Sequence, residues 1–190
     1  MTASYNPFGL RPVYSPMGIV RPFSGQIKSG YATDIFQYQP VRYGLSTDSG
    51  SVEGYIVPAA AGERIIGTFM GVEFVDSTGR QRVSNYWPAS TTATEIIAYF
   101  TTDYTIVYEI QANATLAIAS IGGQYDITSA TGSAPLGFSS TGLNVASSAT
   151  NAGLRVVGLS DYVDNAWGDA YPIVQVQISE HQNVADRAAY

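Results

Sequence analysis

Residues 104–111 read YTIVYEIQ, and large apolar side chains fall at every second position, as in Ile106, Tyr108 and Ile110. Because successive side chains of a β-strand point to opposite faces, this period of two predicts a strand with one face toward a hydrophobic core. Ile173–Ile178 repeats the pattern as IVQVQI. These two stretches predict a protein built from β-strands.

Seven further stretches have strand-like sequences and are separated by Gly, Asp, Ser, Thr and Pro. They are Ile35–Tyr43, Gly54–Pro58, Arg64–Val75, Gln81–Trp87, Glu95–Phe100, Leu116–Ile121 and Leu154–Leu159. Thr78-Gly79 lies between two of them and predicts a hairpin turn. Glu95–Phe100 and Asn183–Ala189 would each support only a turn or two of helix, because neither sustains a 3.6-residue period. The 190 residues are therefore predicted to form a single all-β domain, a β-sandwich or jelly roll or another barrel.

The first segment of the chain has a different character. Asn6–Phe23 (NPFGLRPVYSPMGIVRPF) contains four of the nine prolines, which favour extended backbone and exclude a helix. Its large apolar side chains need a surface to cover. We therefore expect residues 1–33 to form an extended arm that either wraps its own domain or, as we favour, lies on a neighbouring subunit. The residues expected to contact that subunit are Phe8, Leu10, Arg11, Tyr14, Ile19, Arg21 and Phe23.

Charge is divided unevenly along the chain. Residues 1–33 hold Arg11, Arg21 and Lys28 and no acid, whereas residues 34–190 hold all 15 acids and six arginines. This asymmetry predicts an acidic partner for the arm. The net charge of −6, with a single lysine, argues against non-specific binding to nucleic acid, because neutralising phosphates supplies most of that affinity.

Within the expected β domain, 34–190, the segment 128–152 is mostly Ser, Thr, Gly and Ala. Four isolated bulky residues, Leu136, Phe138, Leu143 and Val145, interrupt it. This composition predicts a long surface loop or insertion. Such a loop either binds a partner or has none, and the sequence does not separate the two.

The residues needed for most catalytic and metal sites are scarce. There is no cysteine, and the one histidine, His181, is expected at the surface. The acidic cluster Asp161, Asp164, Asn165 and Asp169 lacks the ligand spacing of an EF-hand and is expected to be a polar turn. We expect no catalytic activity, no cofactor and no metal. No targeting segment or membrane span is expected either.

Several phrases resemble small structural proteins of tailed phage particles. They are NPFGLRPV, SGYATDIFQYQPV (Ser29–Val41), GTFMGVEFVDSTGRQRVSNYWPA (Gly67–Ala89), VYEIQANA, IGGQYD and DNAWGDAYPIVQVQISEHQ. Together they resemble the capsid cement or decoration proteins of short-tailed bacteriophages. That resemblance implies a β-rich protein, often a homotrimer, made in the host bacterial cytoplasm and bound to the capsid exterior. Its partners would be the major capsid protein and copies of itself, and its arms would fasten neighbouring capsomers.

Two other functions stay open from the sequence. The 14 tyrosines and two tryptophans would suit a tail or spike component that recognises a host surface glycan. A hydrolase that uses two carboxylates is the third alternative, because the separation it needs cannot be derived from sequence. A major capsid protein is disfavoured, because we expect no long helix.

Overall fold

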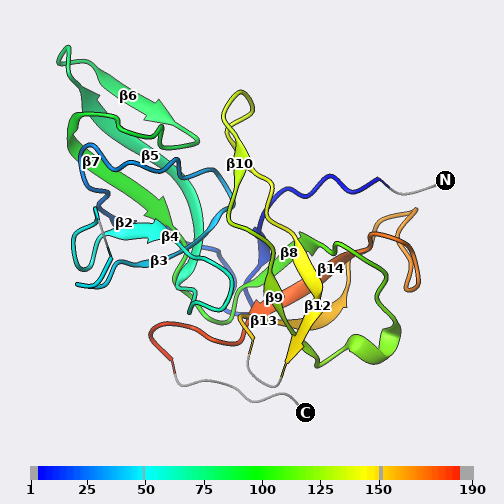
Figure 1. Cartoon of the computed structure of the whole chain (residues 1–190). Helices are drawn as coiled ribbons and strands as arrows, with labels where there is room; N and C mark the ends of the chain where they lie inside the picture. Colours follow the sequence, from blue (N-terminus) through cyan, green and yellow to red (C-terminus); the bar gives the residue numbers. More distant parts are fainter. Residues whose placement is uncertain (1–3, 49, 150–151, 185–190) are drawn as a thin grey trace.

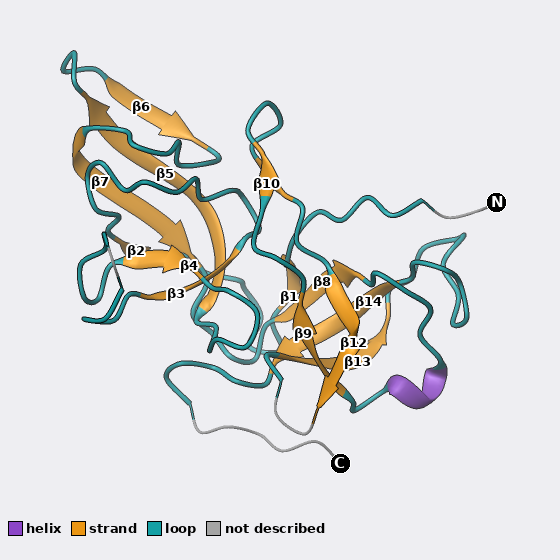
Figure 2. Cartoon of the chain, viewed as in Figure 1, coloured by secondary structure: helices purple, strands orange, loops and turns teal. Residues whose placement is uncertain are grey.

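The structure is a computed structural model that describes residues 4–48, 50–149 and 152–184. These residues form fourteen β-strands and one short 3₁₀-helix, which confirms the all-β prediction (Figure 2). The elements are β1 (Arg11–Tyr14), β2 (Phe23–Gly25), β3 (Pro40–Tyr43), β4 (Ile56–Pro58), β5 (Gly67–Asp76), β6 (Gln81–Ser84), β7 (Ala93–Phe100), β8 (Val107–Gln111), η1 (Ile118–Ser120), β9 (Gln124–Ile127), β10 (Gly132–Ser133), β11 (Phe138–Ser139), β12 (Leu143–Ala149), β13 (Leu154–Leu159) and β14 (Ile173–Ile178).

The strands form two large sheets that lie side by side (Figure 1). Sheet I has the order β2-β7-β5-β3-β4, with β6 added beside β5. Sheet II has the order β1-β8-β14-β13-β9-β12, and β10 and β11 form a separate hairpin. Each sheet encloses its own hydrophobic cluster, so the single domain expected from the sequence contains two cores.

Sheet II is built on the two stretches whose alternation was clearest in the sequence. β8 and β14 are antiparallel neighbours, with Tyr108 opposite Val176 and Ile110 opposite Val174. All four side chains are buried in the sheet II core. The apolar alternation therefore identified both strands and the face that each one buries.

In both sheets a strand at one end is hydrogen-bonded to a segment at or near the other end. In sheet II the parallel bridge between Ala112 and Leu143 connects the end of β8 to β12, and Asn113 N donates to Leu143 O at 2.9 Å. In sheet I, Ile56 N in β4 donates to Gln26 O just after β2 at 2.8 Å. These contacts curve each sheet around its hydrophobic cluster.

Buried polar contacts near Thr101 are one of the links between the two sheets. Thr101 Oγ1 and the Tyr108 hydroxyl share a hydrogen bond of 2.8 Å, although β7 of sheet I ends just before one and β8 of sheet II contains the other. His181, after β14, lies 3.0 Å through Nε2 from Thr102 O, and its Nδ1 accepts from Asn183 N at 3.2 Å. His181 is therefore buried and hydrogen-bonded at both nitrogens, and the expected surface histidine is wrong.

One sequence-based strand assignment needs correction, and the possible C-terminal helix is largely untested. Leu116–Ile121 was expected to be a strand but contains the 3₁₀-helix η1. Ile118 and Ile121 are exposed and only Leu116 is buried, so the apolar residues do not share one core-facing side as in a strand. Of the possible C-terminal helix, residues 183–184 lie in a turn and the remainder lies outside the described residues.

The Ser/Thr-rich segment 128–152 is more ordered than its composition indicates. It contains the hairpin β10–β11 and the strand β12, which pairs with β9 through Leu143 opposite Ile127. Leu143 is buried in the sheet II core, with Val145 packed against it, whereas Leu136 and Phe138 are exposed at the hairpin. Small polar residues concealed the strand because only its first residues have a bulky core-facing side chain.

Gly67→Ala is expected to disrupt the junction between the sheets. A Cβ on Gly67 would lie 1.7 Å from the backbone oxygen of Thr101, which cannot move without breaking the Thr101–Tyr108 contact. We expect a loss of at least about 3 kcal/mol in the free energy of unfolding. Gly158→Ala is the matched control in a strand, since its nearest atom would be Gln175 Oε1 at 3.7 Å. Urea unfolding monitored by the buried Trp87 measures both, and equal midpoints for the two variants would contradict this packing.

Candidate association site

The N-terminal arm crosses from one sheet to the other. β1 pairs with β8 of sheet II, where Arg11 lies opposite Glu109, and β2 pairs with β7 of sheet I, where Phe23 lies opposite Phe100. In Figure 1 it is the blue segment between the two sheets. Both pairings are within the same chain. The arm therefore packs against its own domain at β1 and β2 and does not extend away from it along its whole length.

Two of the expected contact residues are used inside the chain. Leu10 is fully buried in the sheet II core, and its amide donates to Tyr38 O at 2.7 Å. Leu10 is therefore a core residue of its own chain and is not available to a neighbouring subunit. Phe8 is half-buried, and its ring lies 4.9 Å from the Arg11 guanidinium in a cation–π contact.

Arg11 also has its acidic partner within the chain. Its Nη2 atom donates to Glu109 Oε2 and to the Tyr162 hydroxyl, and that hydroxyl donates to Glu109 at 2.8 Å. Burial of Glu109 would raise its pKa, but the hydrogen bonds from Arg11 and Tyr162 outweigh burial and lower it. Arg11 thus fixes the arm to sheet II, which corrects its expected role of meeting an acidic neighbour.

The remaining expected residues lie on the outside. Tyr14, Ile19 and Phe23 have exposed fractions of 48%, 72% and 57%, and Met17 between them reaches 79%. Arg21 is exposed too, and no ion pair with it is found in the described part of the chain. The structure brings Ile19, Arg21 and Phe23 together, and adds Met17, which the sequence analysis did not select.

A tight turn holds Met17 outward. Gly18 N donates to Ser15 O at 2.9 Å, and Gly18 has a φ of +110°, a conformation that favours glycine. Ser15 Oγ accepts from Met17 N at 3.2 Å and donates to Asp103 Oδ2 at 3.3 Å. The turn is therefore anchored to the connection between β7 and β8, and the Met17 side chain is presented at its tip.

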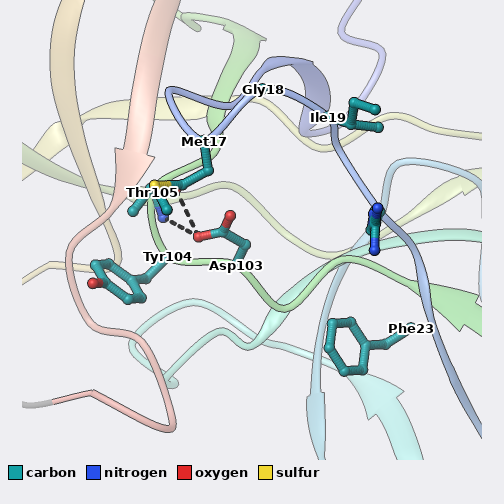
Figure 3. Close-up of a pocket in the computed structure, with 8 residues that line it drawn as sticks. Met17, Gly18, Ile19, Phe23, Asp103, Tyr104 and Thr105 are labelled. Carbon is teal, nitrogen blue, oxygen red and sulfur yellow. Dashed lines mark hydrogen bonds between the residues drawn. The ribbon is translucent and has the colours of Figure 1, made fainter.

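Between this turn and that connection lies a groove of about 660 Å³, which we call the seam groove (Figure 3). It is lined by Met17, Gly18, Ile19, Arg21, Phe23, Asp103, Tyr104 and Thr105. Its two walls are the two segments that connect the sheets, residues 15–22 and 101–106. The groove is thus lined mainly by apolar side chains and lies where the sheets join, a common place for binding sites.

The wall of the groove opposite the arm is held rigid by Asp103. Its carboxylate accepts from Thr105 N at 2.8 Å and Thr105 Oγ1 at 2.7 Å, as Figure 3 shows, and from Ser15. Burial acts to raise the pKa of Asp103, but these hydrogen bonds prevail and lower it. Sequence analysis missed this wall by extending the strand back to Tyr104, although Asp-x-Thr is a local turn signal.

The acidic cluster near the C-terminal end forms a turn, as expected. Asn165 Nδ2 donates to Ser160 O and to Ile173 O, both at 2.8 Å, and Asp169 accepts from Ala166 N at 2.7 Å. In the described ranges no group of three or more His, Cys, Asp or Glu side chains is arranged to hold a metal ion. Asp161 and Asp164 point outward at the surface.

A second ion cluster, absent from the sequence analysis, lies at the edge of sheet I. Arg42 is buried and its guanidinium contacts Asp48 at 2.7 Å and Glu63 at 2.8 Å. Hydrogen bonds from Arg42 and from Leu45 N hold the pKa of Asp48 at about 2. The cluster ties two surface loops to β3, a structural role that accounts for its geometry.

Comparison with protein-family models, with curated proteins and with solved structures finds no significant match to this chain. In the part of the chain that the structure describes, no helix has the length and apolar character needed to cross a membrane.

Glu109→Gln is expected to lower stability in a pH-dependent way. The folded-state pKa of Glu109 is below its unfolded value, about 4.3, so its stabilisation is present above that pH and is lost as pH falls through the folded pKa. The free energy of unfolding of the native protein should exceed that of the variant by about 1 kcal/mol at pH 7, and this difference should shrink below about pH 4. Urea unfolding across this range measures the difference, with Glu53→Gln at an exposed position as control. A stability difference that stays constant to pH 2 would show that the charge of Glu109 does not stabilise the fold.

Proposed function

We propose that the protein is a capsid cement or decoration protein, a virion structural protein that binds the outer surface of an icosahedral phage capsid and stabilises contacts between capsomers. The observation that carries the proposal is the row of exposed large apolar side chains along the arm, from Tyr14 through Met17 and Ile19 to Phe23. Met17, Ile19 and Phe23 line one groove, and exposed apolar side chains gathered in this way mark a site of association with another protein.

The energetics of the arm suit a fastener. Full burial of one large apolar side chain contributes about 1.5 to 3 kcal/mol to the free energy of binding. Partial burial of the four exposed side chains of the arm would therefore give a strong contact. The cost of ordering the arm has already been met within the chain, because β1 and β2 fix its two ends. A surface that is rigid before it binds loses less entropy on docking than a flexible tail does.

The partners in this proposal are the major capsid protein and further copies of the chain, with a homotrimer on the capsid exterior. A trimer that grips three sites together gains avidity, so a modest contact for each arm is enough. Nucleic acid and lipid surfaces are disfavoured as partners by the net charge of −6. The role is structural, with no catalytic step.

The direct test adds purified protein to expanded empty heads of the phage that encodes it and measures co-sedimentation and head melting. The proposal expects saturable binding at a fixed ratio to the capsid protein and a higher melting temperature of the heads. Absence of binding to heads, together with binding to host cells that is competed by surface glycan, would replace the proposal with the tail or spike function.

Ile19→Ala combined with Phe23→Ala should weaken head binding by at least about tenfold, because both side chains lose apolar contact area. Leu136→Ala, at an exposed position on the β10–β11 hairpin, is the matched control and should bind normally. Raising the salt concentration should reduce native binding only modestly, since screening weakens charge contacts and spares apolar ones. If the double variant binds heads as tightly as the native protein, the arm does not contribute to head binding.

A further inference from the structure

The loop between β13 and β14 presents an exposed apolar residue at its tip. Asn165 N donates to Tyr162 O at 3.1 Å, which closes a turn with Val163 and Asp164 at its centre. Val163 is fully exposed to solvent. Turn positions favour Gly, Asn, Asp, Ser and Pro, so a fully exposed valine there is not explained by the turn itself. We call residues 161–164 the knob.

The knob is held rigid from both sides. Asn165 donates to Ser160 O and Ile173 O, and Ile173 N donates back to Asn165 Oδ1 at 3.0 Å. The Tyr162 hydroxyl is bound to Glu109 and Arg11. Because the loop is fixed at its base, insertion of its tip into a partner costs little conformational entropy.

The knob and the seam groove have opposite charges at their rims. Asp161 and Asp164 flank Val163, are exposed and form no ion pair within the described ranges. At the groove, Arg21 stands exposed beside Ile19 and Phe23. The one acid of the groove, Asp103, directs its carboxylate to Thr105 and Ser15 inside the chain. An apolar centre with a charged rim on each surface matches the anatomy of a protein interface.

We propose that the knob of one copy inserts Val163 into the seam groove of a second copy, with Asp161 and Asp164 beside the partner's Arg21. The contact is between copies, because within one chain Val163 touches nothing that covers it. The inference rests on the proposed function only in taking the arm as an association surface, and it names the partner of that surface.

This contact joins two different surfaces and is therefore head-to-tail. Repeating it closes a ring when the rotation between copies allows closure, and a ring of three would fill every groove and use every knob. The knob of the neighbouring copy would then cover the part of the arm that lines the groove, and the capsid would be bound by the assembled ring. In that case Ile19→Ala with Phe23→Ala weakens head binding by disrupting the ring.

The first test is the mass of the free protein in sedimentation equilibrium without any phage head. The native protein should associate, and Val163→Asp should raise the dissociation constant by at least about tenfold. Leu136→Asp makes the same change of charge at an exposed apolar position on another loop and should associate like the native protein. Circular dichroism checks that both variants fold. A monomeric native protein, or equal behaviour of the two variants, would overturn the inference.

The second test reverses the charges. Asp161→Lys with Asp164→Lys should weaken association, and adding Arg21→Glu to the same chain should restore it. Failure of the third change to restore any association would contradict the pairing of knob and groove.

The third test mixes two defective variants. Met17→Asp blocks the groove and leaves the knob, whereas Val163→Asp blocks the knob and leaves the groove. Each alone should be monomeric, and an equimolar mixture should form a one-to-one dimer, because only one productive contact is available. A mixture that stays monomeric would contradict a head-to-tail contact. If the free protein is monomeric but still binds heads, the cement function holds and this interface is wrong. If the protein associates but does not bind heads, the interface holds and the cement function is wrong.

Discussion

The hydrogen bond between Thr101 Oγ1 and the buried Tyr108 hydroxyl joins the two halves of the molecule. Thr101 comes directly after the last strand of sheet I, and Tyr108 faces the core of sheet II. Both groups are buried, so loss of this contact would leave the Tyr108 hydroxyl buried without its hydrogen-bond partner, a cost that keeps the junction closed. The absence of a side chain at Gly67 allows β5 to approach this point. Thr101 N donates to Thr68 O there, and Thr68 N donates to Thr101 Oγ1, both at 3.0 Å. The short connections that cross the junction are consequently held side by side, and the seam groove is the space between them.

This geometry explains why the arm, which is rich in proline and apolar residues, lies on the surface across the junction of the two sheets. One part of the arm packs inward: Leu10 completes the sheet II core and Arg11 satisfies the buried Glu109. The other part, from Tyr14 to Phe23, lies across the junction with its large side chains outward. Prolines suit this path because edge strands and turns need few backbone donors. The arm thus contributes to the stability of its own fold while presenting a rigid apolar surface to another protein.

The sequence predicted what depends on local pattern and missed what depends on distant pairing. Alternation identified β8 and β14, because each buries one face against the same core. Ile19 and Phe23, predicted to contact a neighbouring subunit, are exposed, because this apolar, proline-rich segment has little regular structure to join. The burial of Leu10 and His181 could not be derived, since each depends on partners far along the chain, such as Tyr38 for the Leu10 amide and Thr102 for His181. β12 was missed because its small residues carry little periodic signal, and Val163 because nothing in the sequence shows that a turn residue will be exposed.

The central claim is that the outer surface of the arm is covered by another protein subunit in the working state. Hydroxyl-radical footprinting with mass spectrometry measures this directly, because Met17 is both highly reactive and exposed in the free chain. Labelling of Met17 and Ile19 should fall severalfold in the assembled state. Ile118, which is exposed on η1 away from the arm, should be labelled at the same rate in both states. Unchanged labelling of Met17 and Ile19 on assembly would show that the arm stays in contact with water, and the account would be wrong.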